Sequence, residues 1–216
     1  MKIFLDTADT EVIRERVETG LIDGVTTNPT LIRKSGRDPL DVYKEIKDMG
    51  VPDISMEVMG TMKEMVYDGI SLKERFGDVS TIKVPCTRDG LLACRHLSKE
   101  LIRTNVTLVF TIPQAILAAK SGATYVSPFV GRLDDQQVAG LELIRGISDM
   151  FARHRVRTEV LSASIRTVQR ATRSWYNGAD IVTMPPSVFD KMYDHVLTEK
   201  GMEIFEKDAS EIVHNA

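Results

Sequence analysis

Short β-like runs alternate with longer helix-like stretches along this chain. Parallel strands need crossover connections, so a regular alternation of this kind predicts a parallel sheet covered by helices. We predict eight strands, at residues 2–6, 24–27, 53–58, 80–84, 104–110, 124–130, 158–164 and 180–184. Helix-like spacing of apolar residues is found at 11–19, 39–49, 62–76, 91–101, 113–121, 135–154 and 167–177.

The length of the chain suits a closed barrel. Eight units in 216 residues average 27 residues each, and a (β/α)8 barrel uses about 200 to 250 residues. A doubly wound open sheet is the alternative, but units of similar length favour closure, and no glycine-rich nucleotide-binding motif follows the first strand. We predict an α/β fold, a single (β/α)8 TIM barrel domain over residues 1–216 with an additional C-terminal helix at 198–213.

The composition of the chain argues against several classes of protein. The chain has 28 Lys+Arg against 31 Asp+Glu and a formal net charge of −3, which disfavours a surface built to bind nucleic acid. No apolar run approaches the about 20 residues of a membrane-spanning helix, and Asp6 interrupts the apolar stretch that a signal peptide would need. Cys86 and Cys94 are too few for a disulfide framework, and the four histidines are widely spaced. We expect a soluble cytoplasmic protein that binds no nucleic acid, membrane or metal.

Strand parity separates the side chains that face the helices from those that face the barrel interior. The outward set is apolar and includes Leu5, Ile82, Val106 and Leu108. The inward set is mostly polar: Phe4, Asp6, Ser55, Glu57, Thr81, Lys83, Asn105, Thr107, Tyr125, Ser127, Phe129, Ser162 and Ser164.

Three of the inward residues carry a charge, namely Asp6, Glu57 and Lys83. Barrel interiors are normally filled by Val, Ile and Leu, and an isolated buried charge is costly. All three lie toward the C-terminal ends of their strands, where this fold places active sites. The pattern indicates an enzyme; the alternatives are a helix-capping aspartate, a solvated lysine and a structural Glu57–Lys83 ion pair.

The uncharged polar candidates allow two interpretations. Asn28 precedes Pro29, which constrains it to an extended conformation, and a plain turn explains it as well as a binding role does. Asn105 and Thr107 fit hydrogen-bonded core positions and site positions equally well.

Two arginines follow late strands of the predicted barrel. Arg132 comes after Gly131, and Arg166 comes after Ser164 at the start of a helix. A serine hydroxyl and arginine forks near a helix start suit a phosphate monoester, and barrels often bind phosphate in their late loops. We predict a phosphate site here; two solvent-exposed arginines are the alternative.

An inward lysine with two carboxylates suits covalent amine catalysis. Burial favours the neutral form of an amine, which can attack a carbonyl to form an imine. The imine is an electron sink for cleaving or forming a carbon–carbon bond, and a carboxylate can move the proton of the reacting hydroxyl. With the arginine site added, the residues predict a sugar phosphate as substrate and no cofactor.

Five motifs along essentially the whole chain support a resemblance: FLDTA at 4–8, GVTTNPT at 24–30, IKVP at 82–85, NVTL at 105–108 and SPFVGR at 127–132. With these motifs the sequence resembles the transaldolase family, in particular its small single-domain branch shared with fructose-6-phosphate aldolase. The family reaction moves a dihydroxyacetone unit from sedoheptulose 7-phosphate or fructose 6-phosphate to an aldose phosphate, in the non-oxidative pentose phosphate pathway.

The resemblance implies a role for each candidate residue. Lys83 would form the Schiff base and Asp6 would act as acid and base at the reacting hydroxyl. Glu57 and Thr107 would position and activate water. The substrate would be held by Asn28, Asn105, Ser127 and Phe129, and its phosphate by Arg132, Ser164 and Arg166.

The resemblance leaves the branch to be decided. Aldolases of the small branch carry glutamine in place of Glu57 and tyrosine in place of Phe129, so both positions here match transaldolases. The alternatives are a fructose-6-phosphate aldolase that releases free dihydroxyacetone and a non-catalytic barrel that binds sugar phosphates. By resemblance the chain is also expected to form a homo-oligomer, a decamer of two pentamers, in which the C-terminal helix reaches across subunits.

Overall fold

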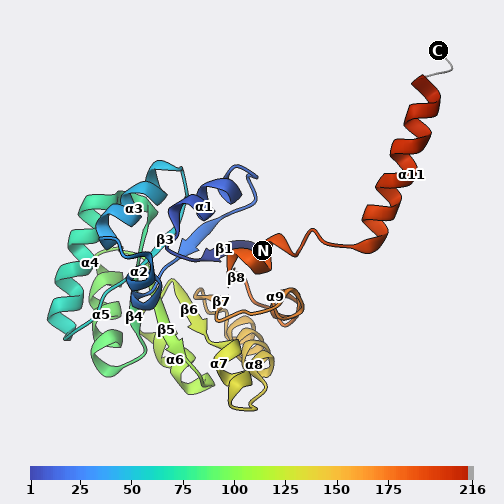
Figure 1. The fold of residues 1–216 in the computed structure, drawn as a ribbon. Helices are drawn as coiled ribbons and strands as arrows, with labels where there is room; N and C mark the ends of the chain where they lie inside the picture. The colour runs from blue at the N-terminus through green and yellow to red at the C-terminus, as the bar shows by residue number, and fades with distance from the viewer. Residues whose placement is uncertain (214–216) are drawn as a thin grey trace.

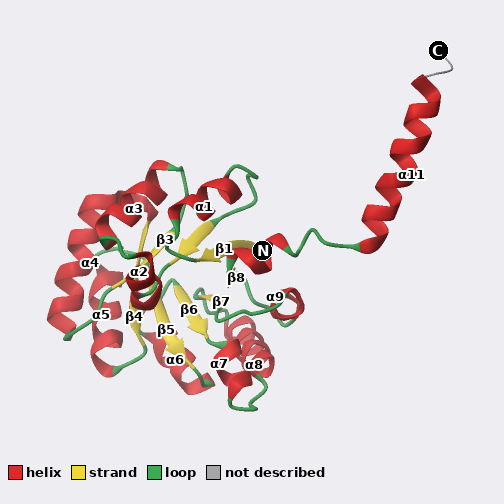
Figure 2. Cartoon of the chain, in the orientation of Figure 1, coloured by secondary structure: helices red, strands yellow, loops and turns green. Residues whose placement is uncertain are grey.

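Eight parallel strands close into a barrel in the computed structural model, which describes residues 1–213. Each strand pairs with its neighbour in sequence, and β8 pairs with β1. Helices surround the strands (Figure 1, Figure 2). The predicted α/β (β/α)8 barrel is confirmed; residues 214–216, which the single-domain prediction included, lie outside the described residues.

The element bounds follow the predicted alternation. The strands are β1 Lys2–Asp6, β2 Gly24–Thr26, β3 Ile54–Glu57, β4 Ser80–Pro85, β5 Thr104–Val109, β6 Tyr125–Pro128, β7 Glu159–Ser162 and β8 Ile181–Met184. The helices are α1 Thr10–Val17, α2 Pro29–Ser35, α3 Pro39–Asp48, α4 Met62–Phe76, α5 Arg88–Lys99, α6 Ile112–Lys120, α7 Val130–Asp135, α8 Gly140–His154, α9 Val168–Tyr176, α10 Pro186–Asp190 and α11 Val196–Val213, with a 3-10 turn at Gly77–Val79.

Three short helices, α2, α7 and α10, were not predicted. Each is five to seven residues long, which is too short for an apolar repeat to stand out from the sequence. Helix α2 instead begins at a local signal, because the Asn28 side chain accepts a hydrogen bond from the Leu31 amide at 3.0 Å and Pro29 occupies the first helical position.

An apolar cluster centred on Phe4 fills part of the barrel interior. Gly24 makes room for the ring of Phe4, since a Cβ at Gly24 would lie 2.6 Å from that ring. The Phe4 and Tyr125 rings form a T-shaped pair with their centroids 6.2 Å apart. This packing fills part of the barrel interior, and Leu161 and Ala163 of the cluster also border the polar inward residues. The buried members of the cluster are Phe4, Tyr125, Leu161, Ala163 and Ile181.

The parity prediction was wrong for Ser162. Its hydroxyl lies 2.8 Å from that of Ser174 on α9, so Ser162 faces the helices. Leu161 and Ala163 take the inward positions instead. The small residues around Ser162 give alternation little contrast between the two faces, which is why the pattern misassigned them.

Leu108 also departs from its predicted outward position. Its φ of +58° and a register shift between Val106 and Val109 mark a bulge in β5. Because of the extra residue, Val109 rather than Leu108 joins the core between strands and helices. The bulge directly follows Thr107, whose side chain faces the interior.

Helix α11 projects away from the barrel (Figure 1). Its apolar side chains are exposed, with Leu197 and Phe205 each 68% accessible. No helix within residues 1–213 is both long and apolar enough to cross a membrane.

Candidate active site

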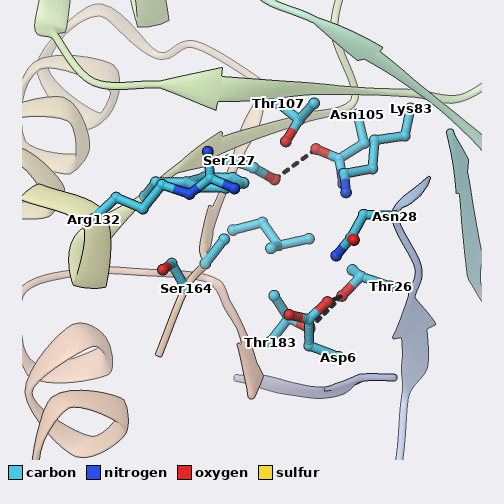
Figure 3. A pocket seen from close by; sticks show the side chains of 13 residues that line it. Asp6, Thr26, Asn28, Lys83, Asn105, Thr107, Ser127, Arg132, Ser164 and Thr183 are labelled. Atoms are coloured by element: carbon cyan, nitrogen blue, oxygen red, sulfur yellow. Dashed lines mark hydrogen bonds between the residues drawn. The ribbon is translucent and has the colours of Figure 1, made fainter. Parts of the chain in front are cut away.

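A polar pocket lies inside the barrel at the C-terminal ends of the strands (Figure 3). It holds about 460 Å³ of empty space, counted to its open mouth. Every predicted site residue lines this pocket except Glu57 and Arg166. The lining residues are Asp6, Thr26, Asn28, Lys83, Asn105, Thr107, Ser127, Phe129, Arg132, Leu161, Ala163, Ser164 and Thr183.

Strand β4 carries Lys83 into the pocket with only 5% of the residue accessible. Its apolar neighbours Ile82 and Val84 are fully buried in the core between strands and helices. The Lys83 Nζ donates a hydrogen bond to the Thr27 carbonyl at 2.8 Å and lies 2.9 Å from the Glu57 Oε2. Both side chains of this ion pair are buried, so the amine is fixed beside a carboxylate.

Asp6 ends β1 among hydroxyl groups. The Thr26 hydroxyl donates to the Asp6 Oδ1 at 2.8 Å and lies 2.6 Å from the Thr183 hydroxyl. Burial raises the pKa of Asp6, while the positive charge of Lys83 and the hydrogen bond from Thr26 oppose the shift. A carboxyl group with a raised pKa suits proton transfer near neutral pH.

Sequence reasoning missed Thr26 and Thr183. Thr26 is the register partner of Asp6 on β2, and Thr183 is the register partner of Phe4 on β8. Applying strand parity to the second and eighth strands would have found both, because Phe4 and Asp6 were already assigned inward.

A hydrogen-bonded chain of polar side chains crosses the other side of the pocket (Figure 3). Ser127 donates to the Asn105 Oδ1 at 2.6 Å, and the Asn105 Nδ2 donates to the Ser55 hydroxyl at 3.2 Å. These bonds fix the orientation of the buried Asn105 amide. The Thr107 hydroxyl is buried and has no hydrogen-bond partner among the described residues, so it offers a polar atom to a ligand or water.

Asn28 is the N-cap of a helix rather than part of a plain turn. Its Oδ1 caps α2, and its side chain also lines the pocket. Because the oxygen is engaged by the helix, the Nδ2 is the part of the amide that remains for a ligand.

Arg132 and Ser164 line the side of the pocket opposite Asn28 (Figure 3). The Arg132 guanidinium lies over the Phe129 ring, 5.0 Å from its centroid. Ser164 has a left-handed backbone with φ of +60°, and its carbonyl accepts a hydrogen bond from the Gly131 amide at 3.1 Å. Arg166 does not reach the lining and instead forms a two-point ion pair with Asp135 on α7.

Metal ligands are not gathered in the part of the chain that the structure describes. Within residues 1–213, no group of three or more His, Cys, Asp and Glu side chains is placed to hold a metal ion. Cys86 and Cys94 are free thiols, and burial raises the pKa of each.

A pocket lined by a buried lysine, the Asp6 carboxyl group and Arg132, with Glu57 paired to the lysine, agrees with the comparisons to known proteins. The sequence model described as "Transaldolase/Fructose-6-phosphate aldolase" matches residues 3–216. The chain belongs to this family.

Relatives match along nearly all of their length. A "Probable transaldolase" of Caulobacter vibrioides is 51% identical over 209 residues, covering 96% of both chains. One of Paracoccus denitrificans is 49% identical with the same coverage. These names support an enzyme of the transaldolase kind.

A solved structure shares the fold alone. The thiamine phosphate pyrophosphorylase from Pyrococcus furiosus aligns with a TM-score of 0.57 over 85% of each chain, at 16% identity.

Proposed function

We propose that this protein is a transaldolase that transfers a dihydroxyacetone unit from sedoheptulose 7-phosphate or fructose 6-phosphate to an aldose phosphate. The observation that carries the proposal is the fixed Lys83 amine, 2.9 Å from the Glu57 carboxylate in a pocket that also contains Asp6. Family membership supports the same reaction, which belongs to the non-oxidative pentose phosphate pathway.

In the proposed mechanism, Lys83 attacks the ketose carbonyl after passing a proton to Glu57. The resulting carbinolamine loses water to give an imine, with Glu57 and the Thr107 hydroxyl holding that water. The unpartnered Thr107 hydroxyl supports this role. No cofactor is needed, because the protonated imine itself accepts electrons.

Asp6 then takes the proton of the hydroxyl next to the bond that breaks. The carbon–carbon electrons move to the imine nitrogen, which leaves an enamine on Lys83 and releases an aldose phosphate. Asn28, Asn105 and Ser127 would hold the three-carbon unit by its hydroxyl groups. An acceptor aldehyde adds in the reverse sense, and water hydrolyses the new imine.

The basic side of the pocket supports a phosphorylated substrate. Arg132 and Ser164 line it, and Arg166 follows Ser164 by two residues. We propose that these three residues bind the phosphate, which places the reacting carbonyl near Lys83 at the opposite side.

The family description also covers fructose-6-phosphate aldolase, which releases free dihydroxyacetone. Phe129 lines the pocket with a ring that carries no hydroxyl group, so it cannot supply a proton or order water for release of the enamine. This feature favours transfer over release. The buried ion pair of Lys83 and Glu57 in the barrel interior disfavours a non-catalytic barrel.

We further propose a homo-oligomer that acts in the cytoplasm. Exposed apolar residues on α11 support association with another copy, and the resemblance to the small branch suggests a decamer of two pentamers. Two free thiols agree with a reducing compartment. The proposed partners are sugar phosphates, without nucleic acid or membrane.

Turnover of fructose 6-phosphate with and without erythrose 4-phosphate tests the proposed reaction. We expect glyceraldehyde 3-phosphate to be released rapidly only when the acceptor is present. Equal release without the acceptor would show an aldolase instead, and no release under either condition would leave a binding protein.

A further inference from the structure

Asp135, the last residue of α7, accepts hydrogen bonds from the two terminal nitrogens of the Arg166 guanidinium. Nη2 lies 2.5 Å from the Asp135 Oδ2, and Nη1 donates to the Oδ1. The hydrogen bond from Arg166 lowers the pKa of Asp135, so the carboxylate stays charged at neutral pH. Both side chains are about half accessible, at 55% and 45%.

This ion pair leaves the edge of the guanidinium that carries Nε available to another ligand. An arginine has five N–H donors arranged in two forks, one formed by the terminal nitrogens and one that includes Nε. Asp135 occupies the terminal fork. The fork with Nε therefore remains available to a second anion.

The available edge lies beside the Ser164 hydroxyl. The position that a Cβ would take at Gly131 is 3.1 Å from the Arg166 Nε, 3.0 Å from the Ser164 Oγ and 2.1 Å from the Ser164 carbonyl oxygen. That carbonyl accepts the Gly131 amide hydrogen bond and fills the position itself. The absence of a side chain at Gly131 therefore allows this close backbone approach, which keeps the Nε and Oγ donors near one another beside Gly131. Ser164 also lines the pocket, and so does Arg132 from the same helix as Asp135.

We propose that Asp135 is a positioning residue for phosphate binding. It holds Arg166 by the terminal nitrogens, so that the Nε edge stays beside Ser164 and completes the phosphate site with Arg132. Asp135 touches Arg166 and not the substrate. This inference rests on the proposed function for its substrate, a phosphate monoester.

Two opposing free-energy contributions decide whether Asp135 strengthens or weakens phosphate binding. A long arginine side chain that must be ordered on binding loses rotamer freedom, whereas one already held in place does not. The Asp135 carboxylate also repels a phosphate, which opposes the gain. Because Asp135 binds the terminal fork and leaves the Nε edge unbound, we infer that ordering outweighs repulsion.

Asp134 provides a matched control on the same helix. Its Oδ2 lies 3.1 Å from the Arg170 Nε, and its Oδ1 accepts from the Gly140 amide at 3.2 Å. An Asp134→Asn change removes the same charge one residue away and leaves the Asp135–Arg166 ion pair intact. A general field effect would therefore appear in both variants.

The test compares Asp135→Asn with Asp134→Asn in the full-length protein. With fructose 6-phosphate as donor, we expect Asp135→Asn to raise the KM for erythrose 4-phosphate about fivefold with kcat unchanged. The KM for unphosphorylated erythrose stays the same, and Asp135→Glu restores part of the loss. An unchanged or lower KM for erythrose 4-phosphate would overturn the proposal, and so would an equal effect of Asp134→Asn.

Inorganic phosphate binding, measured by calorimetry, separates this inference from the proposed reaction. We expect Asp135→Asn to weaken phosphate binding about fivefold and Asp134→Asn to leave it unchanged, even if the wild-type protein shows no transfer activity. Equal or tighter binding by Asp135→Asn would overturn the inference, while a lack of turnover alone would overturn only the proposed function. Thermal unfolding of each variant checks that the barrel is intact.

Discussion

Lys83 and Glu57 are direct register partners on β4 and β3, and their charged atoms lie 2.9 Å apart inside the barrel. Adjacent strands of a parallel barrel hold such partners at the same level, so the amine and the carboxylate are positioned by backbone pairing. A structural ion pair and a catalytic pair would share this geometry. The effect of removing the carboxylate on kcat distinguishes a structural ion pair from a catalytic pair.

The Glu57→Gln variant removes the carboxylate and keeps the shape of the side chain. If Glu57 accepts the proton of the amine and handles water, kcat for transfer falls about 100-fold. A steady-state assay with fructose 6-phosphate and erythrose 4-phosphate measures the change. Unchanged kcat would assign Glu57 a structural role only. The exposed Glu142→Gln on α8 controls for the loss of charge.

Replacing Asp6 with asparagine is expected to lower activity and raise the stability of the folded protein at neutral pH. Burial raises the pKa of this carboxyl above its ordinary 3.8, so the folded state binds its proton more tightly than the unfolded state does. That contribution is full below the ordinary pKa and is lost as pH rises through the folded pKa. We therefore expect Asp6→Asn to unfold at a higher temperature than wild type at neutral pH.

The same Asp6→Asn variant should lose about 1000-fold in kcat, since the amide cannot take the hydroxyl proton. Thermal unfolding at pH 4 and pH 7 measures the stability part: the advantage of the variant shrinks at the lower pH. A variant that is less stable than wild type at pH 7 would contradict this account of Asp6.

Two substitutions at Ser164 separate its hydroxyl from its backbone. Glycine adopts the left-handed conformation at φ +60° freely, whereas alanine there costs about 1 kcal/mol. Both variants lack the hydroxyl, so both should raise the KM for erythrose 4-phosphate. Ser164→Gly should unfold about 2–4 °C above Ser164→Ala. Equal unfolding temperatures would mean that the backbone at this position is not strained.

Helix α11 provides the test of assembly. Phe205 is 68% accessible on a helix that projects from the barrel, and burying it against another copy would drive association. We expect Phe205→Asp to give a smaller particle by light scattering while the barrel stays folded. Lys207→Asp, on the same helix, is the control. An unchanged mass for Phe205→Asp would exclude this face from the interface.

Much of the site followed from strand parity alone. Asp6, Lys83 and Asn105 sit on regular strands, where alternation places every second side chain inward, and all three reach the pocket. The register that joins neighbouring strands then brings residues from distant parts of the chain to one level. Local rules of this kind can be read from a single sequence.

Parity failed at two positions for different reasons. Leu108 has a positive φ, and a leucine gives no sign in the sequence that the strand bulges there. Ser162 lies on β7, where small residues give the two faces of the strand little contrast. Ser164 was assigned inward and does line the pocket, but it lies beyond β7 with φ of +60°, so a turn rather than strand alternation directs its side chain. The ion pair between Arg166 and Asp135 depends on how α7 packs beside the β7–α9 connection, which is a tertiary relationship absent from local sequence.

Trapping the covalent intermediate tests the central claim most directly. The protein is incubated with fructose 6-phosphate, reduced with borohydride and digested for peptide mass spectrometry. The proposed mechanism predicts a stable three-carbon adduct on Lys83, which is absent when borohydride is omitted. An adduct on another lysine, or none at all, would contradict the role of Lys83 as the Schiff-base nucleophile.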